Sequence, residues 1–174
     1  MATLALDLLI FAGAFLFMEG VAWFTHKYVM HGFGWVWHRS HHSPRTGMFE
    51  LNDLFAVVFA TPAIVSIYFG VHGYPLLLPL GIGITAYGAV YAMFHDGLVH
   101  RRYPTPLNGK SRFWKTLIQA HRIHHAVTTK HGCVSFGFLI AQPVRKLKAQ
   151  LAEIQMVARV ESVEPDGLES EPLA

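Results

Sequence analysis

Three long apolar stretches constrain the fold of this 174-residue chain more than any other feature. They cover about residues 4–24, 54–71 and 75–94, and the second and third hold no charged residue. Each approaches the ~20 residues that an α-helix needs to cross a bilayer core. The composition agrees, because only 14% of the residues are charged, against roughly 25% in soluble domains. We expect an all-α integral membrane bundle of about three spans and exclude a soluble enzyme.

The first apolar stretch carries two acidic residues, Asp7 near its start and Glu19 near its end. A cleavable signal peptide is the competing interpretation. The stretch has no basic segment before it and no small-residue cleavage site before Thr25, so we expect a retained helix. A carboxylate within a span usually faces the interior of the bundle, and we expect this of Glu19.

The distribution of basic residues predicts the orientation in the membrane. Only residues 72–74 separate the second and third spans, which therefore form a tight hairpin. All 14 Lys and Arg residues lie between spans one and two or after span three. With three spans these regions share one face, which the positive-inside rule makes cytoplasmic, together with the C-terminus. The net charge of +3 thus reflects topology and lipid contact, not nucleic-acid binding.

The chain after the third span is mostly polar. The apolar run 134–141 is too short to cross a bilayer, so we expect it to pack or to dip into the membrane interface. Residues 145–160 have the apolar spacing of a helix, either interfacial and amphipathic or an ordinary cap helix. Residues 161–174 are acidic, and we expect a disordered tail. Residues 1–160 would then form one domain, with a cytoplasmic cap over 26–50 and 95–142.

Histidine is the most informative residue type, with 12 in the chain, and ten of them form four boxes. The order H-x4-H, H-x2-H-H occurs after the first span and again after the hairpin. The boxes are His26 and His31; His38, His41 and His42; His95 and His100; His121, His124 and His125. Four boxes in a duplicated order on one predicted face of the membrane indicate a metal site. The other two histidines lack box spacing: we expect no metal role for His72, in the turn, and leave the role of His131 open.

The spacing bears on how the boxes hold metal. On an α-helix, H-x2-H-H places its three imidazoles within about 100° on one face. The two members of H-x4-H diverge by about 140° on a regular helix. Either the helix is locally widened at these boxes or their two members reach different metals. Ten imidazoles are too many for one ion, so we expect two.

Imidazole suits iron, zinc, copper and nickel, and a neutral shell favours ferrous ions. Two carboxylates lie close to the boxes, Asp96 beside His95 and Asp53 at the start of span two. Each is a candidate acceptor for an imidazole N–H. Helix capping is the equal alternative for Asp53, and a solvated loop acid is the alternative for Asp96.

Around these boxes the chain resembles the membrane-bound histidine-box di-iron oxygenases of the sterol desaturase and fatty acid hydroxylase superfamily, and among them the bacterial β-carotene hydroxylases. The resemblance covers roughly residues 15–150. The matching segments are His26–Gly32, Trp37–His42, Asn52–Leu54, His95–His100, Gln119–Val127 and Cys133–Phe138. It implies that the ten box histidines bind two Fe²⁺ ions, with O2 as the oxidant and electrons from a reduced ferredoxin or NAD(P)H reductase system.

The resemblance also implies hydroxylation of β-carotene at C3 of its β-ionone rings, giving β-cryptoxanthin and zeaxanthin, in the bacterial inner membrane. The carotenoid would enter from the lipid between the spans. Candidate aromatic residues along that route are Trp23, Phe24, Tyr28, Trp35, Tyr91 and Phe94. The alternatives left open are a fatty acid or sterol hydroxylase, a desaturase, a carotenoid ketolase or, from a different class, a histidine-rich metal transporter. A transporter should carry ionisable groups near the middle of several spans, and spans two and three carry none.

Overall fold

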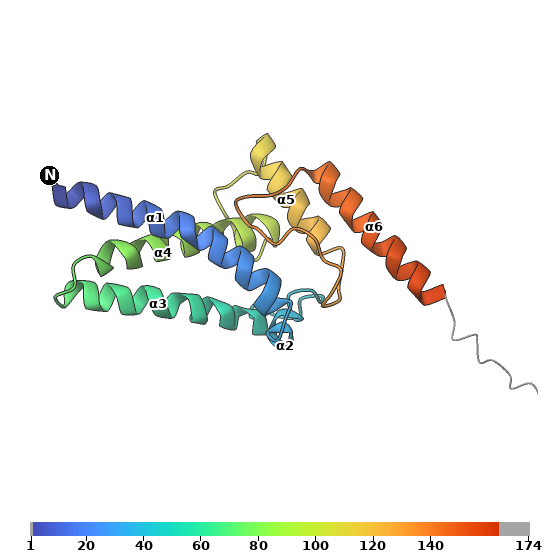
Figure 1. Ribbon diagram of the computed structural model, residues 1–174, viewed down its shortest axis with the longest axis horizontal. Helices are drawn as coiled ribbons and strands as arrows, with labels where there is room; N and C mark the ends of the chain where they lie inside the picture. The colour runs from blue at the N-terminus through green and yellow to red at the C-terminus, as the bar shows by residue number, and fades with distance from the viewer. Residues whose placement is uncertain (1, 164–174) are drawn as a thin grey trace, which may run out of the picture.

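The computed structural model describes residues 2–163, and every regular element within that range is a helix, as the sequence predicts. Three long helices lie side by side and form one end of the molecule (Figure 1). These are α1 (Ala2–Phe24), α3 (Leu54–Val71) and α4 (Leu77–Tyr91). A short helix, η2 (Leu51–Asp53), precedes α3. The chain is thus a helical membrane protein with three apolar helices of spanning length.

Two of the spanning helices continue beyond the predicted ends of the spans at residues 24 and 94. Helix α1 passes into the π-helix η1 (Thr25–Met30), and α4 passes into the π-helix η3 (Ala92–Val99). The continuous helices long and apolar enough to cross a membrane cover Thr3–Met30, Leu51–Val71 and Leu77–Val99. His26 and His95 therefore lie on the last turns of spanning helices. The first residues of the predicted cap segments, 26–50 and 95–142, thus belong to these helices.

Glycine allows the three helices to pack closely. A Cβ atom at Gly83 would lie 2.6 Å from the carbonyl oxygen of Phe11 on α1, and one at Gly81 would lie 2.8 Å from that of Ala63 on α3. Small residues at such crossings let helix backbones approach within a membrane. The α3–α4 turn is also short, and Gly73 takes a left-handed φ of +108° there. This confirms the expected helical hairpin.

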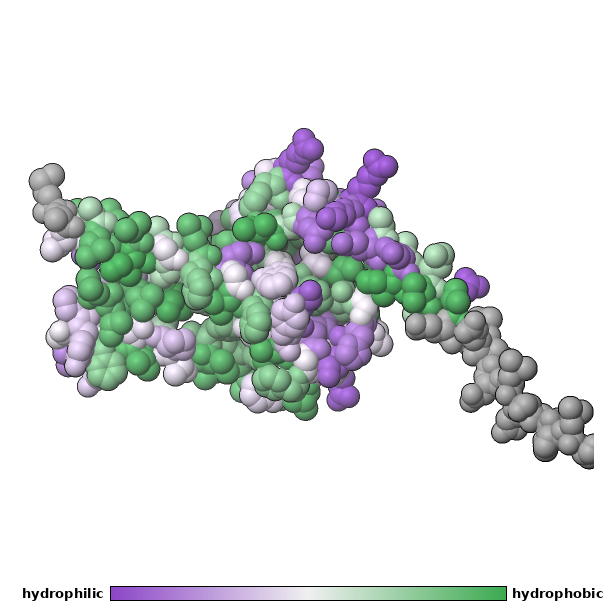
Figure 2. All heavy atoms as spheres, in the orientation of Figure 1, coloured by the Kyte–Doolittle hydropathy of each residue, from purple (hydrophilic) through white to green (hydrophobic). Residues whose placement is uncertain are grey.

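The opposite end of the molecule is a polar cap, and Figure 2 shows the change from apolar surface over the long helices to hydrophilic surface over the cap. The cap contains α2 (Trp35–His38) and α5 (Arg112–His124). Ser111 caps α5 by accepting a hydrogen bond from the backbone N–H of Trp114 at 3.3 Å. The last helix, α6 (Val144–Val163), is anchored on α5 by Leu147, which is fully buried against Ala120 and Val134.

Helix α6 covers residues 145–160, for which the sequence leaves open an interfacial amphipathic helix and an ordinary cap helix. Its first half packs on the cap, and the helix then runs away from the spanning helices (Figure 1). The packing of Leu147 and Leu151 against Ala120 and Val134 favours the cap-helix interpretation, and contact of this helix with the membrane interface stays a prediction. Helix α6 also includes residues 161–163, which the sequence assigned to the tail. The rest of the predicted tail, 164–174, lies outside the described residues.

The apolar run 134–141 contains no helix, and Glu19 of α1 holds it against the bundle. One carboxylate oxygen, Oε1, accepts three backbone N–H bonds, from Phe138 and Leu139 at 2.9 Å and from Ile140 at 3.1 Å. The other oxygen accepts the hydroxyl hydrogen bond of Tyr87 at 2.7 Å. Glu19 is only 9% exposed, so it faces the bundle interior as expected. It joins α1, α4 and the run in one network.

Candidate metal centre

Each H-x4-H box begins on a π-helix and ends at its C-cap, which is His31 for η1 and His100 for η3. This resolves the question that the spacing of the boxes raised. The backbone N–H of His31 donates to the carbonyl of His26 at 3.1 Å, and that of His100 donates to the carbonyl of His95 at 2.9 Å. These are i to i−5 bonds, so residues five apart lie one above the other on the widened turn. The ring centroids are 5.4 Å apart in the first pair and 4.6 Å apart in the second. The two imidazoles of each pair therefore lie close enough to bind the same metal ion.

In each H-x2-H-H box, the middle histidine points in a different direction from the outer two. His121 and His125 lie one α-helical turn apart, with a 3.0 Å backbone bond from His125 to His121. Residues at i and i+4 differ by about 40° around a helix, whereas i+3 lies about 60° to the other side. His124 therefore points away from these two. The first box divides in the same way, although α2 ends at His38 and a turn carries its other two members.

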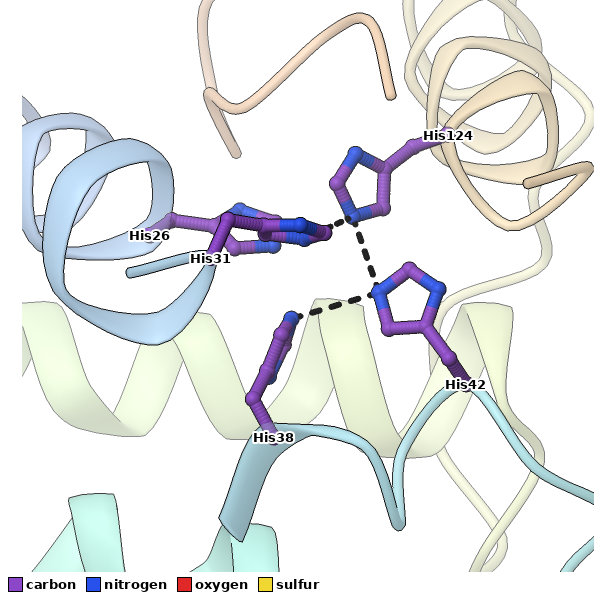
Figure 3. Close-up of side chains that lie close together, drawn as sticks. All are labelled: His26, His31, His38, His42 and His124. Atoms are coloured by element: carbon purple, nitrogen blue, oxygen red, sulfur yellow. Dashed lines mark hydrogen bonds between the residues drawn. The ribbon is translucent and has the colours of Figure 1, made fainter. Parts of the chain in front are cut away.

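The structure brings the ten box histidines into two groups of five. In the first histidine group, one ligand nitrogen from each member lies within 4.8 Å of every other. Figure 3 shows these rings converging from η1, α2 with its following turn, and α5. The first histidine group is His26, His31, His38, His42 and His124. All five are buried.

The second histidine group lies beside the first. Four of its members have ligand nitrogens within 4.8 Å of one another, and they are His41, His100, His121 and His125. We add His95 because its Nε2 lies 3.0 Å from Nε2 of His41. Each group thus takes one H-x4-H pair, the outer two members of one H-x2-H-H box and the middle member of the other. Each group therefore contains one histidine from the other copy of the repeat: His124 in the first group and His41 in the second.

The outer nitrogens of the imidazoles show how the rings are oriented. In seven of the ten, Nδ1 donates to an oxygen acceptor. Four donate to backbone carbonyls: His26 to Phe136, His31 to Lys130, His42 to Val127 and His124 to Val134. Three donate to side-chain oxygens: His38 to Asn52 Oδ1, His41 to Glu50 Oε2 and His95 to Asp96 Oδ1. Their lengths run from 2.7 Å in His38 to 3.1 Å in His41. Nδ1 therefore carries the proton, and Nε2 presents a lone pair to the middle of its group.

The inner nitrogens fit a metal ion better than they fit one another. Nε2 of His31 lies 3.3 Å from Nε2 of His124, and Nε2 of His100 lies 2.9 Å from that of His121. Lone pairs at this distance repel unless a cation lies between them. The buried Nε2 atoms of His26 and His125, one in each group, have no hydrogen-bond partner. Buried polar atoms rarely stay unpaired, so the donor set fits two bound metal ions.

Burial lowers the pKa of the eight box imidazoles that lie outside the spanning helices and so favours their neutral form. These eight are His31, His38, His41, His42, His100, His121, His124 and His125. Burial lowers the pKa of His38 to about 3, against a raising effect of the Asn52 hydrogen bond. Burial likewise lowers the pKa of His42 to about 4 and that of His100 to about 3. Neutral imidazole is the form that binds metal. Before any metal binds, the site already holds its rings in the ligating state.

The two candidate carboxylates have different positions. Asp96 accepts the 2.8 Å bond from Nδ1 of His95, the contact expected for it. Asp53 instead accepts hydrogen bonds from both terminal guanidinium nitrogens of Arg102, each at 2.7 Å. It also accepts the backbone N–H of Glu50 at 3.0 Å, which caps η2. Asp53 thus caps the short η2 but makes no capping bond to α3, the helix of span two, and its expected contact with an imidazole is replaced by Arg102. That arginine also lies 3.5 Å from Asp96 and so joins the two carboxylates.

An apolar cavity of about 370 Å³ lies between the three spanning helices and ends against this site. Its inner end is lined by Asn52 and Asp96, the acceptors of His38 and His95. Its outer end reaches Ile64, twelve residues further along the chain, or about 18 Å at the rise of a helix. Ile64 is 64% exposed, so the cavity opens toward the lipid. An elongated apolar molecule fits this shape.

The aromatic lining predicted for the substrate route is mostly wrong. Of the six candidates, only Tyr91 lines the cavity, together with Phe55, Phe59, Tyr87 and Phe138. Trp23, Phe24 and Tyr28 are 41%, 55% and 50% exposed, because they lie on the outer face of α1 and η1. Trp35 packs on His31, and Phe94 stacks on Trp114. Apolar spacing alone does not distinguish the inner from the outer face of a span that is apolar all round.

Several contributors to the site escaped sequence reasoning about individual residues. Asn52 and Glu50 accept hydrogen bonds from His38 and His41. Arg102 joins Asp53 to Asp96, and only the matched segment Asn52–Leu54 signalled that region. The backbone carbonyls that accept from four imidazoles leave no trace in residue type. The two remaining histidines belong to neither group. His72 donates to the carbonyl of Tyr68 at 2.7 Å in the hairpin turn, and His131 lines an outer groove.

The fold and the site together define a class: a membrane protein of three apolar helices whose polar end carries a histidine-rich site that fits two metal ions. A model of the fatty acid hydroxylase family matches residues 11–142. The chain therefore belongs to the fatty acid hydroxylase family. It is a membrane-bound, metal-dependent hydroxylating oxygenase.

Named relatives narrow the comparison. A beta-carotene hydroxylase of Pantoea ananas is 52% identical over 155 residues, which cover 89% of this chain and 89% of the relative. Another from Pseudescherichia vulneris is 54% identical over 136 residues, covering 78% and 77%. The chloroplastic beta-carotene 3-hydroxylase 2 of Arabidopsis thaliana is 39% identical over 132 residues, covering 74% of this chain and 43% of the relative. No solved structure matches the chain.

Proposed function

We propose that this protein hydroxylates β-carotene at C3 of its β-ionone rings, giving β-cryptoxanthin and then zeaxanthin. The observation that carries this proposal is the cavity, which is apolar, opens toward lipid and ends against the acceptors of His38 and His95. Relatives named beta-carotene hydroxylase, which match most of the chain, support the choice of substrate. A long apolar polyene dissolved in the bilayer would enter at Ile64 and bring one ring to the inner end.

The reaction balances as R–H, O2, two electrons and two protons giving R–OH and water. We infer that the first and second histidine groups hold one Fe²⁺ each and that a ferredoxin-type carrier supplies the electrons. Two iron ions held by these imidazoles would supply the activation of O2 that the C–H bond requires.

The residues of the chain have three tasks in this proposal. The ten imidazoles would bind the metals through Nε2, and the oxygen acceptors on Nδ1 hold seven of these rings in that orientation. The spanning helices exclude water from the cavity, which protects a strong oxidant from side reactions. Residues 1–160 carry all of these parts and would form the single hydroxylase domain.

The proposed location is the bacterial inner membrane, with the metal centre and the C-terminus in the cytoplasm. All 14 Lys and Arg residues lie toward the cap end of the chain's three spans. A reporter fused after Ala174 should respond as cytoplasmic, and one inserted at Gly73 should respond on the opposite side. Both reporters on one side would contradict the three-span orientation.

Product analysis in a β-carotene-producing host tests the proposed reaction. Expression of the full chain should convert β-carotene to β-cryptoxanthin and zeaxanthin, and His41→Ala should abolish the conversion. Ketone or desaturation products would instead favour one of the alternatives of the same superfamily. Iron and zinc content of the purified protein, measured beside turnover after ferrous reconstitution, identifies the active metal.

A further inference from the structure

Phe138 occupies the boundary between the cavity and the metal centre. Its side chain is 4% exposed and lines the cavity. Its ring stacks on His26 of the first histidine group at a centroid distance of 5.6 Å. The same ring contacts two members of the second group, His95 at 5.5 Å and His121 at 6.2 Å. Among the described aromatic residues that line the cavity, only Phe138 has ring contacts with both groups.

The backbone holds Phe138 in this position independently of its side-chain packing. Its N–H donates to Oε1 of Glu19 at 2.9 Å, and the next two N–H groups donate to the same oxygen. Tyr87 fixes the other oxygen of Glu19. A Cβ atom at Gly137 would collide with the carbonyl oxygen of Ile140, so the tight turn requires glycine. Through the backbone of this turn, Glu19 therefore fixes the position of Phe138 in the cavity wall.

Phe136 offers a natural comparison two residues away. Its ring also packs on imidazoles, with centroid distances of 5.3 Å to His31 and 5.3 Å to His124. It contacts only the first histidine group, however, and it lines the outer groove and not the cavity. The two phenylalanines thus share packing on the metal centre, but only Phe138 can touch a molecule in the cavity.

We propose that Phe138, held by Glu19, sets which ring carbon of the substrate faces the metal centre. This inference rests on the proposed function. Helices and turns of the cap hold the imidazoles, and Nδ1 hydrogen bonds fix seven of them. These rings cannot follow a displaced substrate, so the wall of the cavity decides which C–H bond is presented. Tyr91 packs on Phe138 at 4.4 Å and stacks on His95 at 4.8 Å, which makes the wall rigid. Phe138 is then a positioning residue for the site of hydroxylation.

The test is the position of the new hydroxyl group, because a residue needed only for packing would change yield and not position. Phe138→Leu keeps an apolar core residue but removes the ring, and Phe138→Ala removes more. The ratio of C3 to C2 or C4 product should fall by about 10-fold or more, since small changes in an apolar pocket alter discrimination about 10–200-fold. A displacement of about 1 Å would also slow the C3 reaction by about 100-fold.

Three further variants separate the contributions. Phe136→Leu, the matched control, should keep hydroxylation at C3 whatever its total yield. Glu19→Ala should broaden the product position as Phe138→Leu does, because it releases the turn. Glu19→Gln keeps one acceptor oxygen for the turn and should stay closer to wild type. Each variant is expressed as the full chain in a β-carotene-producing host, with iron per chain measured on the purified protein.

The outcomes are distinct. A shift to C2 or C4 in Phe138→Leu, with C3 retained in Phe136→Leu, supports the inference. Hydroxylation only at C3 in both Phe138 variants, with wild type active, would overturn the inference and leave the proposed function intact. A wild-type chain that forms no hydroxylated β-carotene would overturn the proposed function and this inference with it.

Discussion

The two histidine groups are built from the same repeated boxes but differ in the acceptors that hold their rings. In the first histidine group all five Nδ1 atoms meet neutral oxygens, four backbone carbonyls and the amide of Asn52. In the second group the Nδ1 contacts of His41 and His95 are with carboxylates, those of Glu50 and Asp96. Duplicated sequence thus gives two sites of equal ligand type and unequal charge.

This difference has a chemical consequence. A carboxylate acceptor raises the basicity of the imidazole and orients it more firmly than a neutral carbonyl. Glu50 and Asp96 also bring negative charge near a site whose ligands are all neutral, and Arg102 offsets part of it from 3.5 Å away. We therefore expect the two metals to be inequivalent, with the second group better able to support a more positive metal.

The largest expected effect comes from removing one ligand from each group. His41 and His42 are adjacent in sequence but belong to different groups. Either alanine variant should abolish hydroxylation while the protein still accumulates in the membrane, because a metal that has lost a ligand is weakly held. Each should retain about one metal ion per chain, and iron spectroscopy should show a different remaining site in each.

The same experiment extends to His38, His121 and His124, whose alanine variants should also be inactive. His72→Ala is the control, because that ring lies in the hairpin turn and bonds to the carbonyl of Tyr68. It should keep wild-type turnover and metal content. Strong activity in two or more of the box variants would contradict the two-metal assignment.

An intermediate effect should follow from the charge of the acceptors. Asp96→Ala should lower metal affinity or turnover by about 10–100-fold, and Asp96→Asn should lower it less because it keeps an acceptor oxygen. Glu50→Ala and Glu50→Gln should follow the same order. Iron per chain and zeaxanthin formation are the measurements. Wild-type values in all four variants would show that acceptor charge does not distinguish the groups.

The reverse change sharpens this comparison. Asn52→Asp would place a carboxylate on His38 and give the first histidine group an acceptor like those of the second. The iron signal assigned to the first group by the His41→Ala variant should then move toward that of the second. An unchanged signal would indicate that the inequivalence arises elsewhere.

The smallest effect is expected at Asp53, which lies near the second group without bonding to its rings. Asp53→Ala removes the cap of η2 and the partner of Arg102 and should cost about 1 kcal/mol of stability. Its iron content should stay at the wild-type value, unlike that of Asp96→Ala. Thermal unfolding in detergent, with iron measured beside it, checks both. Loss of iron would place Asp53 with the acceptors of the metal centre.

Much of this architecture follows from sequence because its causes are local. Apolar stretches of spanning length predict three helices, since unpaired backbone groups are too costly in lipid. Three connecting residues predict the hairpin. The repeated boxes predict two metal ions at one end. A widened helix is one of two explanations that the H-x4-H spacing leaves open, and the structure shows it as η1 and η3.

The sequence alone determined the class of protein, the number of spans and the ten histidines that meet. Only the tertiary structure decided how these histidines divide into two groups, which carbonyls and carboxylates hold them, and that Asp53 pairs with Arg102. It also decided that Phe138, not the predicted aromatics of α1 and η1, lies at the end of the cavity. The physical reason is that hydropathy and spacing describe one helix at a time. Acceptor contacts and cavity walls depend instead on how separate helices approach one another.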